Sequence, residues 1–174
     1  MKKQSSSYPY AEATAEFMDM AGHHRPGKLI IPLPPEGGRQ PPPGDTGTLK
    51  GLQESITQVV ARIRHPVLRL RLALLMEEVY ELAEAGMRED MAGIARNVAD
   101  VLYVAHSIPL SLGYDGEAVY DCVHKANMTK RMGKTRSDGK QLPPVDFRPP
   151  DVEAVLAASQ REETSETADD STCR

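Results

Sequence analysis

Apolar residues recur at alternating intervals of four and three along residues 66–88, and this spacing constrains the fold more than any other feature of the chain. Because an α-helix repeats every ~3.6 residues, such spacing puts them on one face of a helix. We expect that face to be a buried seam made of Leu68, Leu72, Leu75, Val79 and Leu82. Pro66 lacks a backbone donor and restricts His65, so the sequence predicts two separate helices, near 49–64 and 66–88.

Further helical patterns lie on both sides of this pair. They cover residues 11–21, roughly 90–112 with Pro109 and Gly113 marking the end, a stretch that Asp115 begins as an N-cap, and residues 152–159. No segment shows the alternation of a half-buried strand. The sequence therefore predicts an all-α fold, a helical bundle of four to five helices.

Composition divides the chain into four regions: an N-terminal segment with a short helix (1–21), a Pro/Gly-rich connection (22–48), a helical domain (49–159) and an acidic tail (160–174). The tail has no core-forming residue, and we expect it to be disordered. The pair His23-His24 has no matching ligand set and is interpreted as loop.

Charge and cysteine content bound the function. The net charge is −4, which makes non-specific binding of nucleic acid or anionic membrane unfavourable. No run approaches ~18 apolar residues, and the N-terminus lacks the apolar core of a signal peptide. Two cysteines, Cys122 and Cys173, do not suggest a structural disulfide. We expect a cytoplasmic protein with neither a nucleic-acid nor a membrane partner.

Four glutamates, Glu77, Glu78, Glu81 and Glu84, crowd the second half of the 66–88 helix. They could be an ordinary solvated face. However, the same side of the helix is apolar one and two turns earlier, and no lysine or arginine lies between positions 72 and 87 to offset the like charges. A bound cation would compensate for this repulsion.

Asp100 lies among apolar residues in NVADVLYVA, with Asn97 one turn earlier and Arg96 beside it. We expect a buried carboxylate, which needs a hydrogen-bond network, an arginine or a metal ion. One interpretation is an ion pair with Arg96 or a lysine. The other is a site where Glu78, Glu81 and Asp100 converge, and such hard oxygen ligands suit Mg²⁺ or Mn²⁺.

The positive charge is concentrated in residues 124–140, HKANMTKRMGKTRSDGK, with Arg148 beyond them. This stretch could bind a polyphosphate beside the metal, or it could be a solvated helix C-terminus.

The motifs EEVYE (77–81) and NVAD (97–100) resemble the E-E-x-x-E…E-x-x-D signature of the all-α nucleoside triphosphate pyrophosphohydrolases, which include MazG, phosphoribosyl-ATP pyrophosphohydrolase and the dimeric dUTPases. ANMTK, DGK and RPPD follow in the order of the MazG-like branch, so the resemblance covers roughly 66–156. It implies a MazG-like bundle whose core is completed by dimerisation. It also implies Mg²⁺-dependent cleavage of a nucleotide such as dUTP or dGTP between its α- and β-phosphates, in control of the nucleotide pool.

The resemblance also implies residue roles. Glu78, Glu81 and Asp100 would bind the metal, Glu77 would activate water, and Asn127, Lys130, Lys140 and Arg148 would bind phosphates. Tyr103 is one aromatic candidate for stacking on the base. This chain departs from the signature at Asn97, where the family has a carboxylate. The amide oxygen could still bind Mg²⁺, and Glu84 could substitute.

A homodimer or homotetramer is expected. The alternative is a non-catalytic nucleotide- or partner-binding bundle that lost its chemistry through Asn97, and a purely structural module is a third interpretation.

Overall fold

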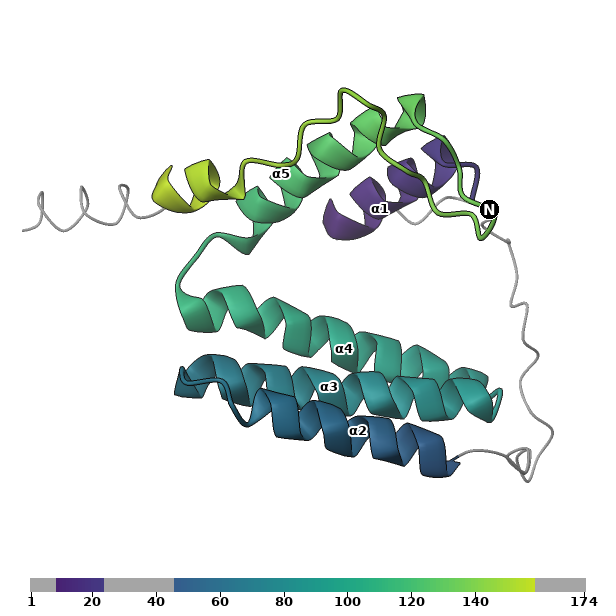
Figure 1. Ribbon diagram of the computed structural model, residues 1–174, viewed down its shortest axis with the longest axis vertical. Coiled ribbons are helices and arrows are strands. Elements are labelled where there is room, and N and C mark those ends of the chain that lie inside the picture. Colours follow the sequence, from purple (N-terminus) through teal and green to yellow (C-terminus); the bar gives the residue numbers. More distant parts are fainter. Residues whose placement is uncertain (1–8, 24–45, 159–174) are drawn as a thin grey trace, which may run out of the picture. The chain divides into compact units, whose positions relative to one another are not determined.

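The computed structural model describes residues 9–23 and 46–158, and within these ranges the regular elements are helices apart from one isolated bridge between Thr135 and Gln141 (Figure 1). The predicted all-α class is therefore confirmed. The elements are α1 (Pro9–Met20), α2 (Thr46–Val60), α3 (Pro66–Met87), α4 (Met91–Leu112), α5 (Gly116–Met128) and a 3₁₀ turn, Thr129–Met132. Residues 152–158 are also helical. Over the described ranges, no helix is both long and apolar enough to cross a membrane.

The chain divides into two compact units. One runs from Lys28 to Gly113 and holds α2, α3 and α4, whereas the other joins Met1–Gly27 to Tyr114–Arg174 and holds α1 and α5. The domain boundaries at 49 and 159 stay predictions. Most of the Pro/Gly-rich connection and the whole acidic tail lie outside the described residues.

The break that Pro66 predicts is present between α2 and α3. His65 has an extended backbone (φ −71°, ψ 116°), and its ring Nδ1 accepts a hydrogen bond from the Leu68 amide at 3.3 Å. A histidine thus caps α3, with proline at the first helical position, where a missing donor costs nothing. The helix before it ends at Val60, four residues earlier than predicted.

The two long helices α3 and α4 run side by side and antiparallel, with α2 along the other side of α3 (Figure 1). At one end Gly93 of α4 lies against Ala85 of α3, and at the other the Arg71 guanidinium donates to the Ser111 hydroxyl at 2.8 Å. A Cβ on Gly93 would lie 3.2 Å from the Ala85 Cβ and 2.5 Å from a carboxylate oxygen of Asp90, so a larger residue would displace the Asp90 cap.

The predicted buried seam of α3 is wrong in its degree of burial. None of its five residues is buried, and Val79 is 41% exposed. Among the described residues, the buried apolar side chains are Val60 and Ala85. The physical reason is that α2, α3 and α4 form a single layer, so α3 divides its apolar residues between two neighbours and leaves its outer surfaces open.

At its C-terminal end α4 passes through Pro109 to Leu112, where the predicted helix ends, and closes with Gly113 in the left-handed conformation (φ 72°). The N-cap predicted at Asp115 is confirmed, since its side chain accepts from the Ala118 amide at 2.9 Å.

In the other unit, α1 lies along α5 through a small set of polar and aromatic contacts. The Tyr10 and Tyr120 rings meet edge to face at 4.4 Å, and the Thr14 and Tyr120 hydroxyls are 2.6 Å apart. His124 Nε2 lies 3.3 Å from Glu16 Oε2. These contacts attach the N-terminal helix to residues more than a hundred positions later.

Candidate functional site

An open cleft of about 640 Å³ lies in the α2–α4 unit and is lined almost entirely by polar side chains. We call it the acidic cleft. Its lining residues are Gln53, Glu77, Glu78, Tyr80, Glu81, Glu84, Ala85, Arg88, Asp90, Gly93, Arg96, Asn97 and Asp100. The structure thus brings together every carboxylate that the sequence singled out, with Asn97 among them.

Glu78 is the α3 glutamate most enclosed by neighbouring charge. Its side chain is half-buried, and desolvation raises the pKa of its carboxyl, with further contributions from the charges of Glu81, Asp100 and Glu77 in that order. Because Asp100 comes from α4, this raised pKa reflects two helices that face each other with carboxylates. The simple interpretation of a solvated face does not explain that arrangement.

Asp100 and Asn97 form the α4 wall of the cleft. Asp100 is half-buried rather than buried as predicted, because its apolar neighbours Val98 and Leu102 point outward and are 41% and 46% exposed. In the described part of the chain Asp100 makes no ion pair with Arg96, although the i,i+4 spacing permits one. Asn97 is only 6% exposed, so a neutral amide occupies the most enclosed position of the wall.

The turn between α3 and α4 closes one end of the cleft. Arg88 Nη2 donates to Glu84 Oε1 at 2.6 Å, and the Asp90 side chain caps α4 by accepting from the Gly93 amide at 3.0 Å. Glu89, between them, has a positive φ of 50°. Sequence reasoning missed Arg88, Asp90 and Gly93, although an aspartate just before a new helical pattern is a recognisable N-cap signal.

The contact with Arg88 bears on the idea that Glu84 replaces the missing carboxylate at position 97. One Glu84 oxygen is already held by a guanidinium, so this side chain is engaged in an ion pair rather than presented to the centre of the cleft.

The donor set of the acidic cleft fits a hard divalent cation. Carboxylates and an amide oxygen are the groups that Mg²⁺ prefers. Desolvation and then the like charges of its neighbours raise the pKa of Glu78, and a cation would offset the like charges. Across residues 9–23 and 46–158, no three Asp, Glu, His or Cys side chains already converge tightly enough to hold a metal. Binding would therefore require rotamer changes by side chains on helices that are already in place.

In the α1–α5 unit, the residues predicted to bind phosphate begin at the end of α5. Lys130 Nζ donates to Asn127 Oδ1 at 2.7 Å and lies 5.5 Å from the centre of the Phe147 ring. Gln141 Nε2 donates back to the carbonyl of Lys130 at 2.9 Å. Lys130 and Asn127 are thus held together before any ligand is present.

Residues 133–142 form a tight loop, which we call the basic loop. Gly133 approaches Leu142 so closely that a Cβ would lie 1.8 Å from its carbonyl oxygen. Two nitrogens of the Arg136 side chain, Nε and Nη2, donate to the Asp138 carboxylate. The Lys140 backbone amide also donates to it. The Arg136 fork, followed by that amide, lowers the pKa of Asp138 to about 2.

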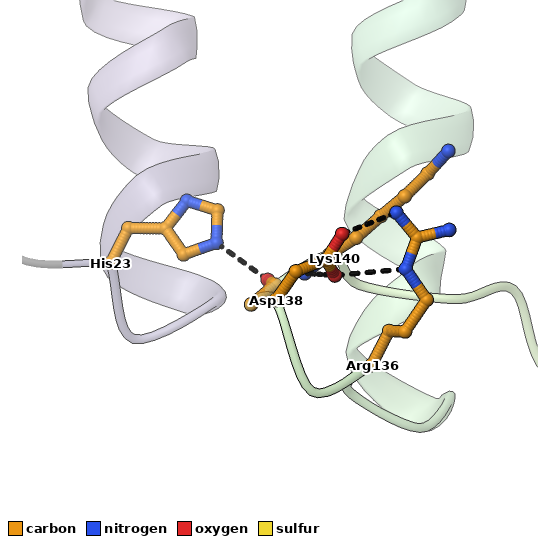
Figure 2. A network of polar contacts seen from close by, with 5 residues as sticks. His23, Arg136, Asp138 and Lys140 are labelled. Atoms are coloured by element: carbon orange, nitrogen blue, oxygen red, sulfur yellow. Dashed lines mark hydrogen bonds and ion pairs between the residues drawn. The ribbon is translucent and has the colours of Figure 1, made fainter.

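The turn of the basic loop is held by a residue that follows α1. His23 Nε2 lies 3.0 Å from the Gly139 carbonyl oxygen, and Gly139 has a left-handed φ of 88° (Figure 2). The ring nitrogen is the donor, since a carbonyl only accepts. The sequence predicts only that His23 lies in a loop, and no local signal predicts a partner 116 positions away.

The remaining predicted site residues are placed as follows. Lys140 and Arg148 are exposed and belong, with Asn127 and Lys130, to the α1–α5 unit. Tyr103 is 80% exposed on α4 and does not line the acidic cleft.

The family model described as phosphoribosyl-ATP pyrophosphohydrolase matches residues 51–127, which include most of α2, all of α3 and α4, and α5 as far as Asn127. A search of curated proteins found no match. The matched residues contain the whole acidic cleft, whereas Lys130, Lys140 and Arg148 lie beyond them. Residues 51–127 are therefore similar to the phosphoribosyl-ATP pyrophosphohydrolase family, in the MazG-like superfamily of all-α NTP pyrophosphohydrolases.

Proposed function

We propose that the protein is a Mg²⁺-dependent pyrophosphohydrolase that cleaves a nucleoside triphosphate between its α- and β-phosphates, giving the monophosphate and pyrophosphate. The family match indicates a pyrophosphohydrolase acting on nucleotides. The observation that supports the finer proposal is the acidic cleft, where carboxylates from α3 and α4 face each other inside the matched residues.

Glu78, Glu81 and Asp100 are the proposed metal ligands, with the Asn97 amide oxygen as a neutral fourth. When bound, Mg²⁺ (or Mn²⁺ in its place) would neutralise charge on the phosphate oxygens. Desolvation and the nearby charges of Glu81, Asp100 and Glu77 raise the pKa of Glu78, and a bound cation would offset that like charge.

Glu77 is the proposed general base. It is exposed at the rim of the cleft, on the turn of α3 that carries the ligands. Its carboxylate would take a proton from water as the water oxygen bonds to phosphorus, and the bond from that phosphorus to the bridging oxygen would break, releasing pyrophosphate.

Asn127, Lys130, Lys140 and Arg148 are the proposed phosphate-binding residues. Support comes from the pre-arranged Lys130–Asn127 pair and from the rigid basic loop that carries Lys140. Lys130 has three donors and uses one on Asn127, which leaves donors for phosphate oxygens.

Deoxynucleotides such as dUTP or dGTP are the proposed substrates, in control of the nucleotide pool. An exposed aromatic, Tyr103, would stack on the base.

A homodimer or homotetramer, in the cytoplasm, is the proposed assembly. The α2–α4 layer leaves large apolar side chains uncovered, including Leu70, which is 56% exposed, and Leu110, which is 83% exposed. A second chain would bury such surface. Light scattering after size-exclusion chromatography would test this, and a monomer at micromolar concentration would contradict it.

Product analysis tests the reaction itself. The pure protein is incubated with Mg²⁺ and each canonical or damaged deoxynucleoside triphosphate, with and without EDTA, and the products are separated by ion exchange. Monophosphate plus pyrophosphate, lost with EDTA, is the expected result. Diphosphate plus orthophosphate would mean that a different bond is cleaved. No product from folded protein would favour the alternative, a non-catalytic nucleotide-binding bundle, which the neutral Asn97 makes a specific possibility.

A further inference from the structure

Two arginines line the acidic cleft, and neither is explained by the proposed metal site. Arg88 lies at the end of α3, and Arg96 lies one turn into α4. Arginine forms bidentate hydrogen bonds with phosphate and remains charged at any physiological pH. A cleft that only bound a cation would gain nothing from two positive charges on its wall.

The contacts of Arg96 leave it available. It stands four residues before Asp100 on α4, which is the spacing of a helical ion pair, yet the described residues include no such pair. Asp100 instead contributes to the raised pKa of Glu78 across the cleft. The Asp100 carboxylate therefore lies near the other acidic groups, and the Arg96 guanidinium lines the cleft without pairing with it.

Arg88 is held in a fixed place by its surroundings. Its guanidinium is drawn back along α3 to Glu84 at 2.6 Å, and its backbone amide donates to the Glu84 carbonyl at 3.2 Å. The turn that follows is constrained by the Asp90 cap and by the contact of Gly93 with Ala85. Glu84 follows Glu78 by six residues, or ~9 Å along the helix axis, a distance of the order that a phosphate chain spans.

We propose that Arg88 and Arg96 bind the pyrophosphate portion of the substrate, and that Glu84 is a positioning residue for Arg88 rather than a metal ligand. This inference rests on the proposed function and adds to it a direction: the bond to be cleaved lies by Glu77, Glu78 and Asp100, and the leaving group extends toward the α3–α4 turn. It also gives the site a source of positive charge where Asn97 has replaced a carboxylate and one metal ligand has lost its charge.

The test is calorimetric titration of the full chain with inorganic pyrophosphate in the presence of Mg²⁺, and separately with Mn²⁺ alone. Arg88→Ala and Arg96→Ala should each weaken pyrophosphate binding by about tenfold or more and leave Mn²⁺ binding within about twofold. Arg88→Lys, which keeps the charge and loses the fork, should fall between Arg88→Ala and wild type. Glu84→Gln should keep Mn²⁺ affinity and weaken pyrophosphate binding several-fold.

Lys125→Ala is the matched control, because Lys125 forms an i,i+4 pair with Asp121 at 2.6 Å on α5, with the same spacing and length as the Glu84–Arg88 pair but outside the acidic cleft. It should bind pyrophosphate as the wild type does. Melting temperatures show whether each variant is folded, and the lysine variant replaces any alanine variant of Arg88 that is not.

Pyrophosphate binding that is unchanged in both arginine variants, or absent in the wild type, would overturn the inference. Loss of Mn²⁺ affinity in Glu84→Gln would overturn the role given to Glu84. These outcomes differ from failure of the proposed function, which is decided by whether the wild type releases monophosphate and pyrophosphate at all.

Discussion

The acidic cleft and the basic loop differ in how their charged side chains are arranged. The basic loop pairs opposite charges, whereas the acidic cleft places like charges near one another. In the basic loop Arg136 is bound to Asp138, the loop amides complete that carboxylate, and the pKa of Asp138 falls to about 2. In the cleft Asp100 has no cationic partner among the described residues, and the pKa of Glu78 rises because of burial and neighbouring acids. The basic loop is thus stabilised by opposite charges, whereas like charges in the acidic cleft repel one another.

This difference distinguishes charged groups that stabilise the fold from charged groups that are available to bind a ligand. Folding alone explains the Arg136–Asp138 fork, since it holds a turn. Folding does not explain carboxylates that face each other from α3 and α4, because burial and neighbouring like charges disfavour ionised Glu78. The following changes test whether this distinction is the right one.

The largest effect is expected from Glu77→Gln. The glutamine keeps the shape of the side chain and loses the ability to accept a proton, so kcat should fall by about 10²- to 10⁴-fold with nucleotide binding largely retained. Single-turnover kinetics and equilibrium binding measure the two quantities. Glu54→Gln, an exposed glutamate of α2 outside the cleft, is the control. Full turnover in the Glu77 variant would remove Glu77 as the base.

Opposite changes at the α4 wall should move metal affinity in opposite directions. Asp100→Asn removes a charged ligand and should weaken Mg²⁺ dependence by roughly 10- to 100-fold, while Asn97→Glu adds a charge and should strengthen it. The same Asn97 variant should lower the melting temperature without metal, because it adds repulsion to an enclosed position. An unchanged Mg²⁺ titration in Asp100→Asn would show that the metal lies elsewhere.

A smaller change is expected from Gly133→Ala in the basic loop. The new Cβ would collide with the Leu142 carbonyl, displacing the loop that carries Lys140. We expect KM for nucleotide to rise about tenfold with Mn²⁺ affinity unchanged, since the cleft ligands are untouched. Gly51→Ala, where a Cβ meets nothing within 4 Å, is the control. A change in Mn²⁺ affinity would mean that the two regions are not independent.

The smallest effect concerns stability without metal. A raised pKa means that the folded state disfavours ionised Glu78, so this penalty is present above the folded pKa and disappears as the pH falls below the ordinary value of 4.5. Glu78→Gln should therefore raise the melting temperature at pH 7 by about 1–3 °C, with little gain at pH 4. Differential scanning calorimetry at the two pH values measures this change. A lower melting temperature of Glu78→Gln than of wild type at pH 7 would contradict the prediction.

The helices and the acidic cluster could be predicted because both are local. Helical periodicity and Pro66 define α2 and α3, and the spacing of EEVYE places its carboxylates on one turn. The burial of the seam could not be predicted, because the pattern shows which residues share a face but not how many neighbours will cover it. Nor could the engagement of Glu84 by Arg88 or the contact of His23 with Gly139, since both depend on side-chain positions or on packing between distant segments.

The left-handed backbone conformation of Glu89 identifies a position where substitution could raise the thermal stability of the protein. A residue with a Cβ pays roughly 1–2 kcal/mol for a positive φ, and asparagine tolerates that conformation far better than glutamate. Asparagine would adopt this backbone conformation at a lower cost, and position 89 is not among the residues assigned to metal, water or phosphate. Thermal stability and catalysis could thus be changed through separate residues, although these residues lie within one tight turn of each other.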